Sequence, residues 1–283
     1  MNNYNGSSMK KAHREFDDEI SDDSLVNPAM VNIPAGWFWM GTSKKQVRYM
    51  YLREEWAEQW HAEGMFFIEQ PQHRLYLEAF EMGKYLVTNV EYHRFVWESN
   101  HRVPRDWIGF NFPDGKAKHP VTGISYDDAV KYCQWLSAET GLDYRLPNEA
   151  EWERAARGDK PRIYPWGDFF DPWRCNTLDS GKGDTTPVGN YSPAGDTIEG
   201  IADMVGNVWE WTSSYLRDYP FDVNDVPPIP GDMTRIVVRG GAWYYSKKLA
   251  RCSSREGMLR DYTSNSLGFR IVRVPKNDNS ANS

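Results

Sequence analysis

The sequence predicts a loop-rich α+β domain, and three of its features lead to that prediction. Aromatic residues are abundant, at 14% of the chain with 13 tryptophans. Short helical and strand-like patterns are dispersed along the chain. Between residues 159 and 235, however, glycine and proline recur and regular patterns are scarce. Because a tryptophan needs apolar cover and a partner for its indole N–H, we expect aromatic side chains to hold these irregular segments in place.

Composition and net charge narrow the range of functions. Hydrophobic residues make up 40% of the 283 residues and charged residues 26%, which is ordinary for a globular protein of one large domain or two small ones. A formal charge of −7 disfavours binding to nucleic acid, which requires concentrated lysine and arginine. No run of 18 apolar residues is present, so insertion into a membrane is not expected.

The cysteines and the N-terminal segment indicate a reducing compartment. Cys133, Cys175 and Cys252 are odd in number, widely separated and outside any C-x-x-C spacing. We therefore expect reduced, buried thiols rather than a disulfide framework or a zinc site. The first residues contain no apolar stretch of the kind that a secretory signal carries, and a cytoplasmic location is expected.

The chain divides into a central domain and two tails. Residues 1–28 are polar and charged, which is typical of a disordered tail, and we expect the domain to span 29–275 with a second tail at 276–283. The stretch MVNIPAGWFWMG (30–41) has the pattern of a strand, a turn and a second strand, so a hairpin-like start is expected there. Residues 43–69 carry an imperfect apolar stripe of helical period and are predicted to form a helical insertion.

Two helices are predicted from their caps. A helix over 89–97 has Thr88 or Asn89 at its N-cap position. A second helix opens at Ser125, with two aspartates in its first turn where the helix dipole favours anions, and it stops at Gly141.

The motif RLPNEAEWERAARG (145–158) is the clearest local signal. Asn148 and Glu151 have the spacing of a capping box, and Gly158 closes the predicted helix. The long irregular stretch that follows must be held by something other than regular structure, such as a metal ion or dense side-chain hydrogen bonding. Strand-like runs are found at 73–88, 234–241 and 266–274.

The residues that could carry chemistry are few. None of the six histidines belongs to a helical metal-binding pair, and no nucleophile elbow, phosphate-binding loop or dinucleotide fingerprint occurs. In IADMVGNVWEWTS (201–213), Asp203, Asn207 and Glu210 supply hard oxygens and Gly206 permits a close backbone approach. Such oxygens suit Ca²⁺, although capping by asparagine or aspartate beside two buried tryptophans would explain the same pattern.

Six motifs, in this order, resemble the formylglycine-generating-enzyme (sulfatase-modifying factor) family: RLPNEAEWERAARG, YPWGD, CNTLDSGKGDTTPVGNY, DMVGNVWEWTS, RGGAW and NSLGFRIVR. The resemblance runs from about Met30 to Pro275. It implies a loop-rich variant of the C-type lectin fold, with little regular secondary structure and structural calcium. That fold would account for both the tryptophans and the long glycine- and proline-rich region.

The resemblance also implies positions for calcium ligands. One site falls on Asp203, Gly206, Val208 and Glu210, with the glycine and valine contributing backbone carbonyls; the family has asparagine in place of the aspartate. A second site would start at Asn176 and Thr177. The loop after them is shorter here than in the family, and Asp179 is the candidate for a further ligand.

Copper is not expected. Formylglycine-generating enzymes carry two cysteines, five residues apart, that bind copper(I) and oxidise a substrate cysteine. Aligned on Gly240 and Gly241, these positions hold Tyr245 and Ala250, and Cys252 is offset by two residues. Because a soft Cu(I) site needs the thiolate pair, the parent chemistry is predicted to be absent.

Two kinds of relative leave two functions open. The layout of WYYSKKLARCSSREGMLRDYTSNSLGFR is similar to that of the variable proteins of diversity-generating retroelements, which are binding scaffolds. Tyrosine and serine on rigid loops offer contact area and adaptable hydrogen bonding at low entropic cost. We expect the segment 244–266 to face outward as a non-catalytic binding surface for an unknown protein or small molecule. Its candidate residues are Tyr244, Tyr245, Ser246, Lys247, Ser253, Ser254, Glu256, Met258, Tyr262, Ser264 and Asn265.

The alternative is an oxidase. Iron-dependent members of the family, and single-domain members without the cysteine pair, imply a metal-dependent oxidase or oxygenase whose redox metal or cofactor is held by other residues. A redox centre would distinguish this alternative from a binding protein.

Overall fold

Three β-sheets organise the chain, and the structure, a computed structural model, describes residues 27–221 and 233–274. The first sheet has the strand order β1-β4-β10-β5 and is antiparallel throughout. Its strands are β1 Met30–Ile33, β4 Phe80–Gly83, β10 Val272–Arg273 and β5 Tyr144–Arg145. The tails predicted at 1–28 and 276–283 fall outside the described residues, apart from Asn27 and Pro28.

The second sheet is a two-stranded ribbon and the third carries the candidate surface. The ribbon pairs β2 Gly36–Met40 with β3 His73–Leu77. The third sheet has the order β8-β7-β6-β9, in which only the β6–β9 pair is parallel. Its strands are β8 Arg255–Leu259, β7 Arg235–Arg239, β6 Trp209–Tyr215 and β9 Leu267–Gly268.

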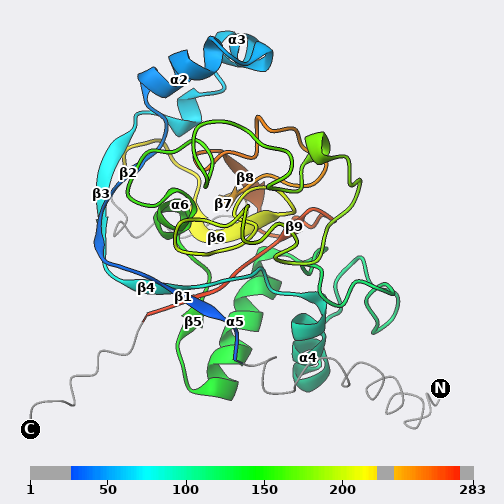
Figure 1. The fold of residues 1–283 in the computed structure, drawn as a ribbon. Coiled ribbons are helices and arrows are strands. Elements are labelled where there is room, and N and C mark those ends of the chain that lie inside the picture. The colour runs from blue at the N-terminus through cyan, green and yellow to red at the C-terminus, as the bar shows by residue number, and fades with distance from the viewer. Residues whose placement is uncertain (1–26, 222–232, 275–283) are drawn as a thin grey trace, which may run out of the picture.

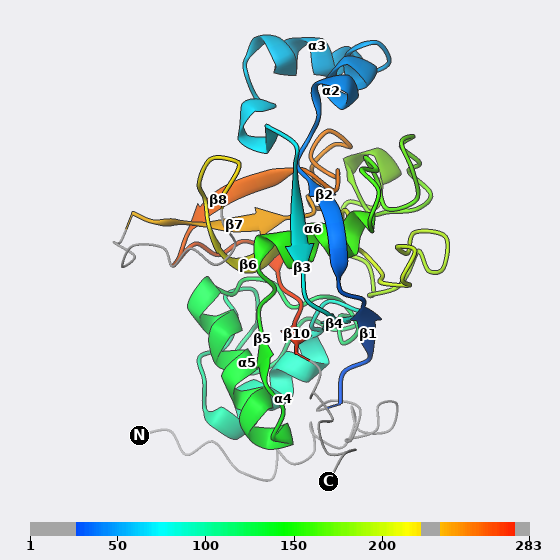
Figure 2. The same ribbon diagram turned by 90° about the vertical axis from the view of Figure 1, so that its left-hand side faces the viewer.

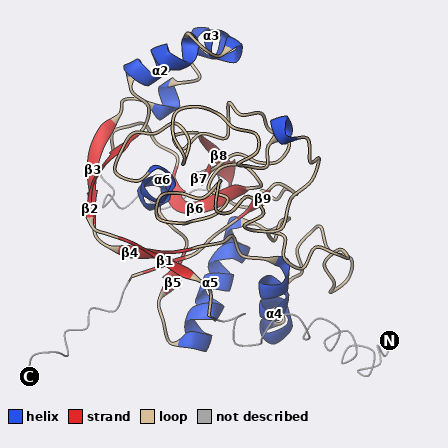
Figure 3. Cartoon of the chain, viewed as in Figure 1, coloured by secondary structure: helices blue, strands red, loops and turns tan. Residues whose placement is uncertain are grey.

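Helices lie at both ends of the molecule and in its centre (Figure 1). They are α2 Lys44–Tyr51, α3 Glu55–Ala62, α4 Asn89–Ser99, α5 Tyr126–Thr140 and α6 Glu149–Arg157, with 3₁₀ turns at Phe67–Glu69 and Leu178–Ser180. In Figure 2 the β2–β3 ribbon runs from the first sheet toward α2 and α3, which stand apart from the body, while α4 and α5 cover the other end. Much of the remaining chain is loop, as Figure 3 shows, and the predicted loop-rich α+β fold is confirmed.

The predicted caps are present because each is a local arrangement. The side chains of Thr88, Ser125 and Asn148 accept hydrogen bonds from the third residue of their helices, and an acidic side chain at that position bonds back to the cap. The helix after Ser125 ends at Gly141 in a left-handed conformation, as predicted.

The hairpin predicted at 30–41 is wrong. β1 pairs with β4 and β2 pairs with β3, so the two strands lie in different sheets. The pairing Ile33↔Phe80 and the pairing Gly36↔Leu77 nevertheless belong to one register that continues across the break. Pro34 lies in the break, where its missing N–H removes no hydrogen bond between strands. The strand expected at 266–274 is also split, into β9 and β10.

Aromatic side chains fill two cores, one between α4, α5 and the third sheet and one around α6. Trp152 and Trp211 are fully buried, and their indole N–H groups donate to Glu210 Oε2 at 2.8 Å and to the carbonyl of Ile124 at 3.4 Å. Others remain on the surface, with Trp173 83% exposed, so only part of the tryptophan content serves the core. The three cysteines are free and buried, as predicted. No helix in the described part of the chain is long and apolar enough to cross a membrane.

Candidate functional site

A tight glycine turn starts the candidate surface after β7. Gly241 has φ +73°, and a Cβ there would lie 2.8 Å from the carbonyl oxygen of Leu249. Only glycine combines this left-handed backbone with so close an approach. The chain therefore leaves the sheet abruptly and folds back on itself as the loop that carries Tyr244 and Tyr245.

Hydrogen bonds from distant segments fix this loop. The carbonyl of Asn207 accepts from the backbone N–H of Trp243 at 3.0 Å, and the carbonyl of Tyr245 accepts from Leu178 at 3.0 Å. Asp179 Oδ2 accepts from the backbone N–H of Lys247 at 2.7 Å. The loop is thus anchored along its length before any ligand arrives.

Side-chain hydrogen bonding also orders the irregular region beneath the loop. Asn207 is fully buried, and its amide accepts from the N–H of Thr186 at 2.9 Å and donates to the carbonyl of the same residue at 3.1 Å. The Asn176 amide donates to Asn207 Oδ1 at 3.2 Å. Dense side-chain hydrogen bonding, one of the two possibilities that the sequence left open, is therefore present here.

The two tyrosines form the centre of a shallow recess. Their rings lie 4.2 Å apart between centroids, and the Tyr244 hydroxyl donates to the Tyr245 hydroxyl at 2.9 Å. Met258, Tyr262 and Ser264 complete the predicted part of the lining, and the recess has about 200 Å³ of empty space, some of it open to solvent. Tyr244 is 36% exposed and Tyr262 43%, so their rings can reach a partner. We call these five residues the tyrosine recess.

The alternation of strand β8 explains why Met258 belongs to the recess. Successive strand residues point to opposite faces, so Glu256 and Met258 share one face while Arg255 points inward. Burial raises the pKa of Tyr245 well above its usual range, and the hydrogen bond to Tyr244 and the charge of Glu256 raise it further. Tyr245 therefore stays a neutral phenol at physiological pH.

Trp209 lines the recess and was not among the predicted surface residues. Its ring centroid is 6.0 Å from that of Tyr245, and its buried indole N–H has no hydrogen-bond partner in the described part of the protein. The alternation in W-E-W was the available signal, because it places Trp209 and Trp211 on one face of β6 and Glu210 on the other. From the sequence, both tryptophans were expected only in the core.

Ser253 and Ser254 do not face outward, which corrects the prediction for this part of 244–266. Both are buried, and the Ser253 hydroxyl donates to Glu69 Oε2 at 2.9 Å. The cause is a pair of inward-pointing arginines on either side. Arg251 forms a bidentate pair with Glu69 at 2.6 and 2.8 Å, and Arg255 forms one with Glu149 at 2.7 and 2.8 Å.

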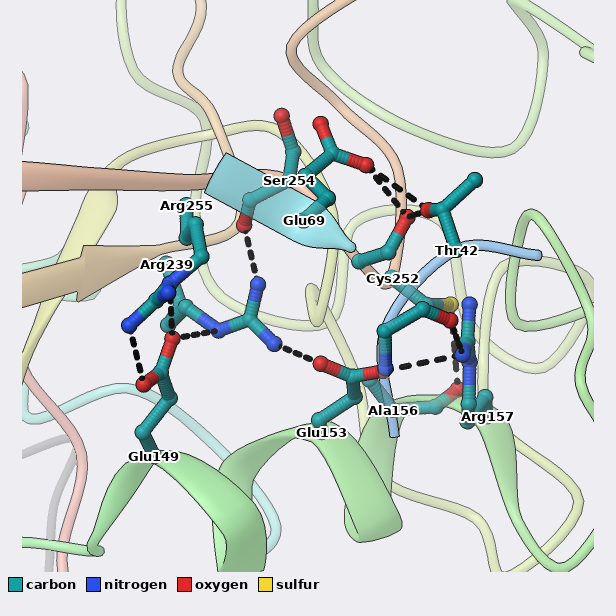
Figure 4. A network of polar contacts seen from close by, with 12 residues as sticks. Thr42, Glu69, Glu149, Glu153, Ala156, Arg157, Arg239, Cys252, Ser254 and Arg255 are labelled. Carbon is teal, nitrogen blue, oxygen red and sulfur yellow. Dashed lines mark hydrogen bonds and ion pairs between the residues drawn. The ribbon is translucent and has the colours of Figure 1, made fainter. Parts of the chain in front are cut away.

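The buried charge network around α6 holds this segment inside (Figure 4). Arg239 contacts Glu153 and donates to the carbonyl of Ser254, and Glu153 also pairs with Arg157 at 2.9 Å. Removing one partner of such a pair leaves an uncompensated buried charge, which costs about 3–5 kcal/mol. The chain from 251 to 255 therefore cannot turn outward without breaking several buried pairs.

The other predicted surface residues lie around the recess in different settings. Ser246 is half-buried beside the loop, and Lys247 Nζ pairs with Glu54 Oε2 of the inserted helices at 2.6 Å. Asn265 lines a neighbouring polar hollow, which it shares with Lys116. The structure thus brings the aromatic candidates together and leaves these polar ones at the edge.

The positions of the missing cysteine pair are filled by groups that cannot replace it. Ala250 is buried, and Tyr245 belongs to the recess. Cys252 lies fully buried with its thiol 3.6 Å from the carbonyl of Ala156, and burial raises its pKa to about 12. Cys252 therefore stays a protonated thiol rather than a metal-binding thiolate.

Glu210, the proposed carboxylate ligand of the first calcium site, is already bound. Arg270 donates from Nε to Oε2 at 2.6 Å and from Nη2 to Oε1 at 2.8 Å, and Trp152 donates to Oε2 at 2.8 Å. Neither the Glu210 nor the Arg270 side chain is exposed. A calcium ion would compete with a guanidinium for the same carboxylate, so this arrangement fits calcium poorly.

The other predicted ligands of the first calcium site also contact groups of the protein itself. Asp203 has φ +56°, and its Oδ2 accepts from the N–H of Gly189 at 2.6 Å. Burial raises the pKa of Asp203 to about 6, so most of this carboxyl is still ionised at neutral pH. Gly206 and Val208 are buried in the same turn, with Gly206 against the backbone of Asn176.

The predicted second calcium site, at Asn176, Thr177 and Asp179, has more accessible oxygen atoms. Asp179 is exposed, and its Oδ2 accepts from the backbone of Lys247 and, at 3.4 Å, from the Thr177 hydroxyl. Asn176 Oδ1 accepts from the Ser180 hydroxyl at 3.3 Å. An amide, a hydroxyl and a carboxylate in one turn are the ligand types that Ca²⁺ takes, so this set fits better, and calcium stays a prediction.

Comparison with known proteins agrees with the motifs. Residues 17–275 match the family model described as the sulfatase-modifying factor enzyme 1-like domain. The formylglycine-generating enzyme of Mus musculus is 28% identical over 88% of this chain and 76% of its own length. The protein named inactive C-alpha-formylglycine-generating enzyme 2, from Bos taurus, is 29% identical over 90% of each chain.

Two solved structures share the fold. PvdO from Pseudomonas aeruginosa superposes with a TM-score of 0.70 at 26% identity, covering 88% of this chain and 95% of that one. Treponema denticola variable protein 1 gives a TM-score of 0.67 at 19% identity over 87% and 95% of the two chains, and at that identity it shows the shared fold alone. The chain therefore belongs to the sulfatase-modifying factor enzyme 1-like family, as the order of its motifs predicts.

Proposed function

We propose that this protein is a non-catalytic binding protein and that its ligand docks on the tyrosine recess. The observation that carries the proposal is the convergence of Tyr244, Tyr245 and Tyr262 on one recess of an anchored loop. Tyrosine gives a large contact area with few rotatable bonds, and an anchored loop loses little entropy on binding. A protein or a small molecule could supply the complementary surface.

The chemistry of the former cysteine positions supports binding rather than oxidation. Tyr245 is a neutral phenol and Cys252 a neutral thiol, so neither offers the charged form that a redox metal or a nucleophilic reaction requires. A relative whose name describes it as inactive shows that the family includes members without the enzymatic activity. We propose that this chain, too, lacks the enzymatic activity.

The proposal also includes a cytoplasmic location and a structural calcium ion. Three free, buried cysteines are consistent with a cytoplasmic protein, because thiols stay reduced in that compartment. Calcium at Asn176, Thr177 and Asp179 would stabilise the turn that supports the recess loop. Elemental mass spectrometry of the purified protein tests this part, and we expect about one calcium per chain.

The alternative is a metal-dependent oxidase or oxygenase, as the similarity to a formylglycine-generating enzyme suggests. In the part of the chain that the structure describes, no three histidine, cysteine, aspartate or glutamate side chains gather as a metal site. An oxidase would therefore depend on a separately bound cofactor. Stoichiometric copper or iron in the same elemental measurement would favour the oxidase over the binding protein.

The test of the binding surface compares matched tyrosines. Tyr262→Ala and Tyr245→Ala remove rings of the recess, whereas Tyr76→Ala removes a ring of similar exposure from strand β3. A partner enriched by the immobilised wild type is then titrated against all four proteins. We expect the two recess variants to lose at least tenfold in affinity, as hot-spot residues do, and the Tyr76 variant to bind normally. Equal affinity for all four proteins would place the binding surface elsewhere.

A further inference from the structure

A second, larger pocket lies between the inserted helices and the loop that follows α6. The turn between α2 and α3 forms one side, and residues 163–169 form the other. The pocket has about 540 Å³ of empty space, part of which is open solvent. We call it the insertion pocket. It is distinct from the tyrosine recess, with which it shares no lining residue.

The pocket has an apolar floor and aromatic walls. Met50, Ile163 and Tyr164 line it and are almost completely buried. Trp56 is half-buried, and Phe169 is 69% exposed at the mouth. An apolar or aromatic side chain of a ligand would be covered on several sides, which stabilises binding roughly in proportion to the apolar area removed from water.

Arg53 brings to the mouth a cation that pairs with no acid among the described residues. Its guanidinium carbon lies 4.5 Å from the ring centroid of Tyr49 and 5.9 Å from that of Phe169. Within residues 27–221 and 233–274, the Arg53 side chain has no hydrogen bond or ion pair. The two rings hold the guanidinium in position and leave its N–H donors available for a carboxylate, which it binds in bidentate geometry.

The two acidic residues of the pocket differ in their hydrogen bonds and ion pairs. Glu54 Oε2 accepts from Lys247 Nζ at 2.6 Å and from Trp56 Nε1 at 3.2 Å, so its charge is neutralised. Asp168 accepts only from the backbone N–H of Ile163, at 3.2 Å on Oδ1, and it forms no ion pair with any described residue. Asp168 and Arg53 therefore face one pocket, carry opposite charges and are not paired with each other.

We propose that the insertion pocket binds a free amino acid with an aromatic or large apolar side chain, its carboxylate on Arg53, its ammonium group on Asp168 and its side chain on the apolar floor. A simple anion would be repelled by Asp168 and a simple cation by Arg53, whereas a zwitterion satisfies both groups. The binding function proposed for the tyrosine recess is not required for this second site.

Calorimetric titration of the full chain with l-phenylalanine tests the proposal. We expect a dissociation constant on the order of 0.1–1 mM, as suits a ligand of that size. N-acetyl-l-phenylalanine lacks the ammonium charge and l-phenylalanine amide lacks the carboxylate, and each should bind at least tenfold more weakly, because each loses a charge-assisted hydrogen bond.

Variants assign each charge to its partner. Arg53→Gln should bind l-phenylalanine at least tenfold more weakly and no longer distinguish it from the amide. Asp168→Asn should weaken binding similarly and no longer distinguish l-phenylalanine from its N-acetyl form, while its amide oxygen can still accept from Ile163. Both residues are exposed, so both variants should fold, which thermal unfolding checks.

Two control variants show whether a loss of binding is specific to the insertion pocket. Arg48→Gln changes an exposed arginine of α2, the helix before Arg53, that does not line the pocket, and Tyr245→Ala changes the tyrosine recess. Both variants should bind l-phenylalanine as the wild type does. No heat of binding at 10 mM l-phenylalanine, or undiminished binding by Arg53→Gln, would overturn the proposal.

Discussion

Glu210 is the residue at which the structure and the family resemblance make opposite predictions. If calcium uses Glu210, then Glu210→Gln removes a metal ligand and destabilises the protein only when calcium is present. In the structure, however, the carboxylate of Glu210 binds Arg270 and Trp152, and neither side chain of the ion pair is exposed. Glu210→Gln would then leave a buried guanidinium without its counter-charge, whether or not calcium is bound.

The magnitude follows from the burial of the pair. Removing one partner of a buried ion pair costs about 3–5 kcal/mol. For a domain of this size, each kcal/mol lowers the melting temperature by about 2–4 °C, so a fall of roughly 10 °C is expected. The exposed pair between Asp127 and Arg260 provides a control, because Asp127→Asn should cost less than about 1 kcal/mol.

The assay is thermal unfolding followed by circular dichroism, in calcium chloride and in chelator. We expect Glu210→Gln to unfold about 10 °C below the wild type in both solutions, and Asp127→Asn to unfold near the wild type in both. A loss that appears only in calcium, with wild type and variant unfolding together in chelator, would contradict this expectation. That result would make Glu210 a metal ligand and would mean that Arg270 does not hold it.

Three further predictions concern pH, backbone and capping. Burial and the charge of Lys116 lower the pKa of His119 to about 4 from 6.5 in the unfolded chain, so the folded state binds fewer protons between these values. The free energy of unfolding should therefore fall as the pH drops from 6.5 to 4. In urea titrations, the His119→Gln variant should show a fall that is smaller by about 1 kcal/mol. The difference is this small because the imidazole is only half-buried. Gly206→Ala would place a Cβ 2.4 Å from the carbonyl oxygen of Asn176 at φ +81°, and we expect little soluble folded protein on gel filtration. Ser125→Ala removes a helix cap and should cost about 1 kcal/mol by chemical denaturation, whereas a change below about 0.3 kcal/mol would mean that the cap adds nothing.

Local signals in the sequence predicted where α4, α5 and α6 begin. Thr88, Ser125 and Asn148 cap helices because the cap and its partner lie three residues apart, so the arrangement needs no information from the rest of the chain. The motif order likewise identified the family, which the match over residues 17–275 confirms.

The sequence predicted in part which residues of 244–266 lie near the surface, because this prediction too used only local information. The composition of 244–266 indicated an aromatic, serine-rich surface, and Tyr244, Tyr245 and Tyr262 do meet in one recess. Ser253 and Ser254, however, have the same local character and are buried. Nothing within that segment distinguishes the two groups, because the difference depends on partners elsewhere in the chain.

The sequence by itself determined the helices with their caps, the loop-rich class and the absence of the cysteine pair, because each depends on neighbouring residues or on residue identity. Only the tertiary structure decided which polar residues are inside. Glu149 and Arg255 lie 106 residues apart in the chain and form a bidentate pair in the interior, although a charged helix such as 149–157 normally faces solvent. A charge can be buried only when its counter-charge arrives at the same place, and that meeting is a property of the fold rather than of either segment.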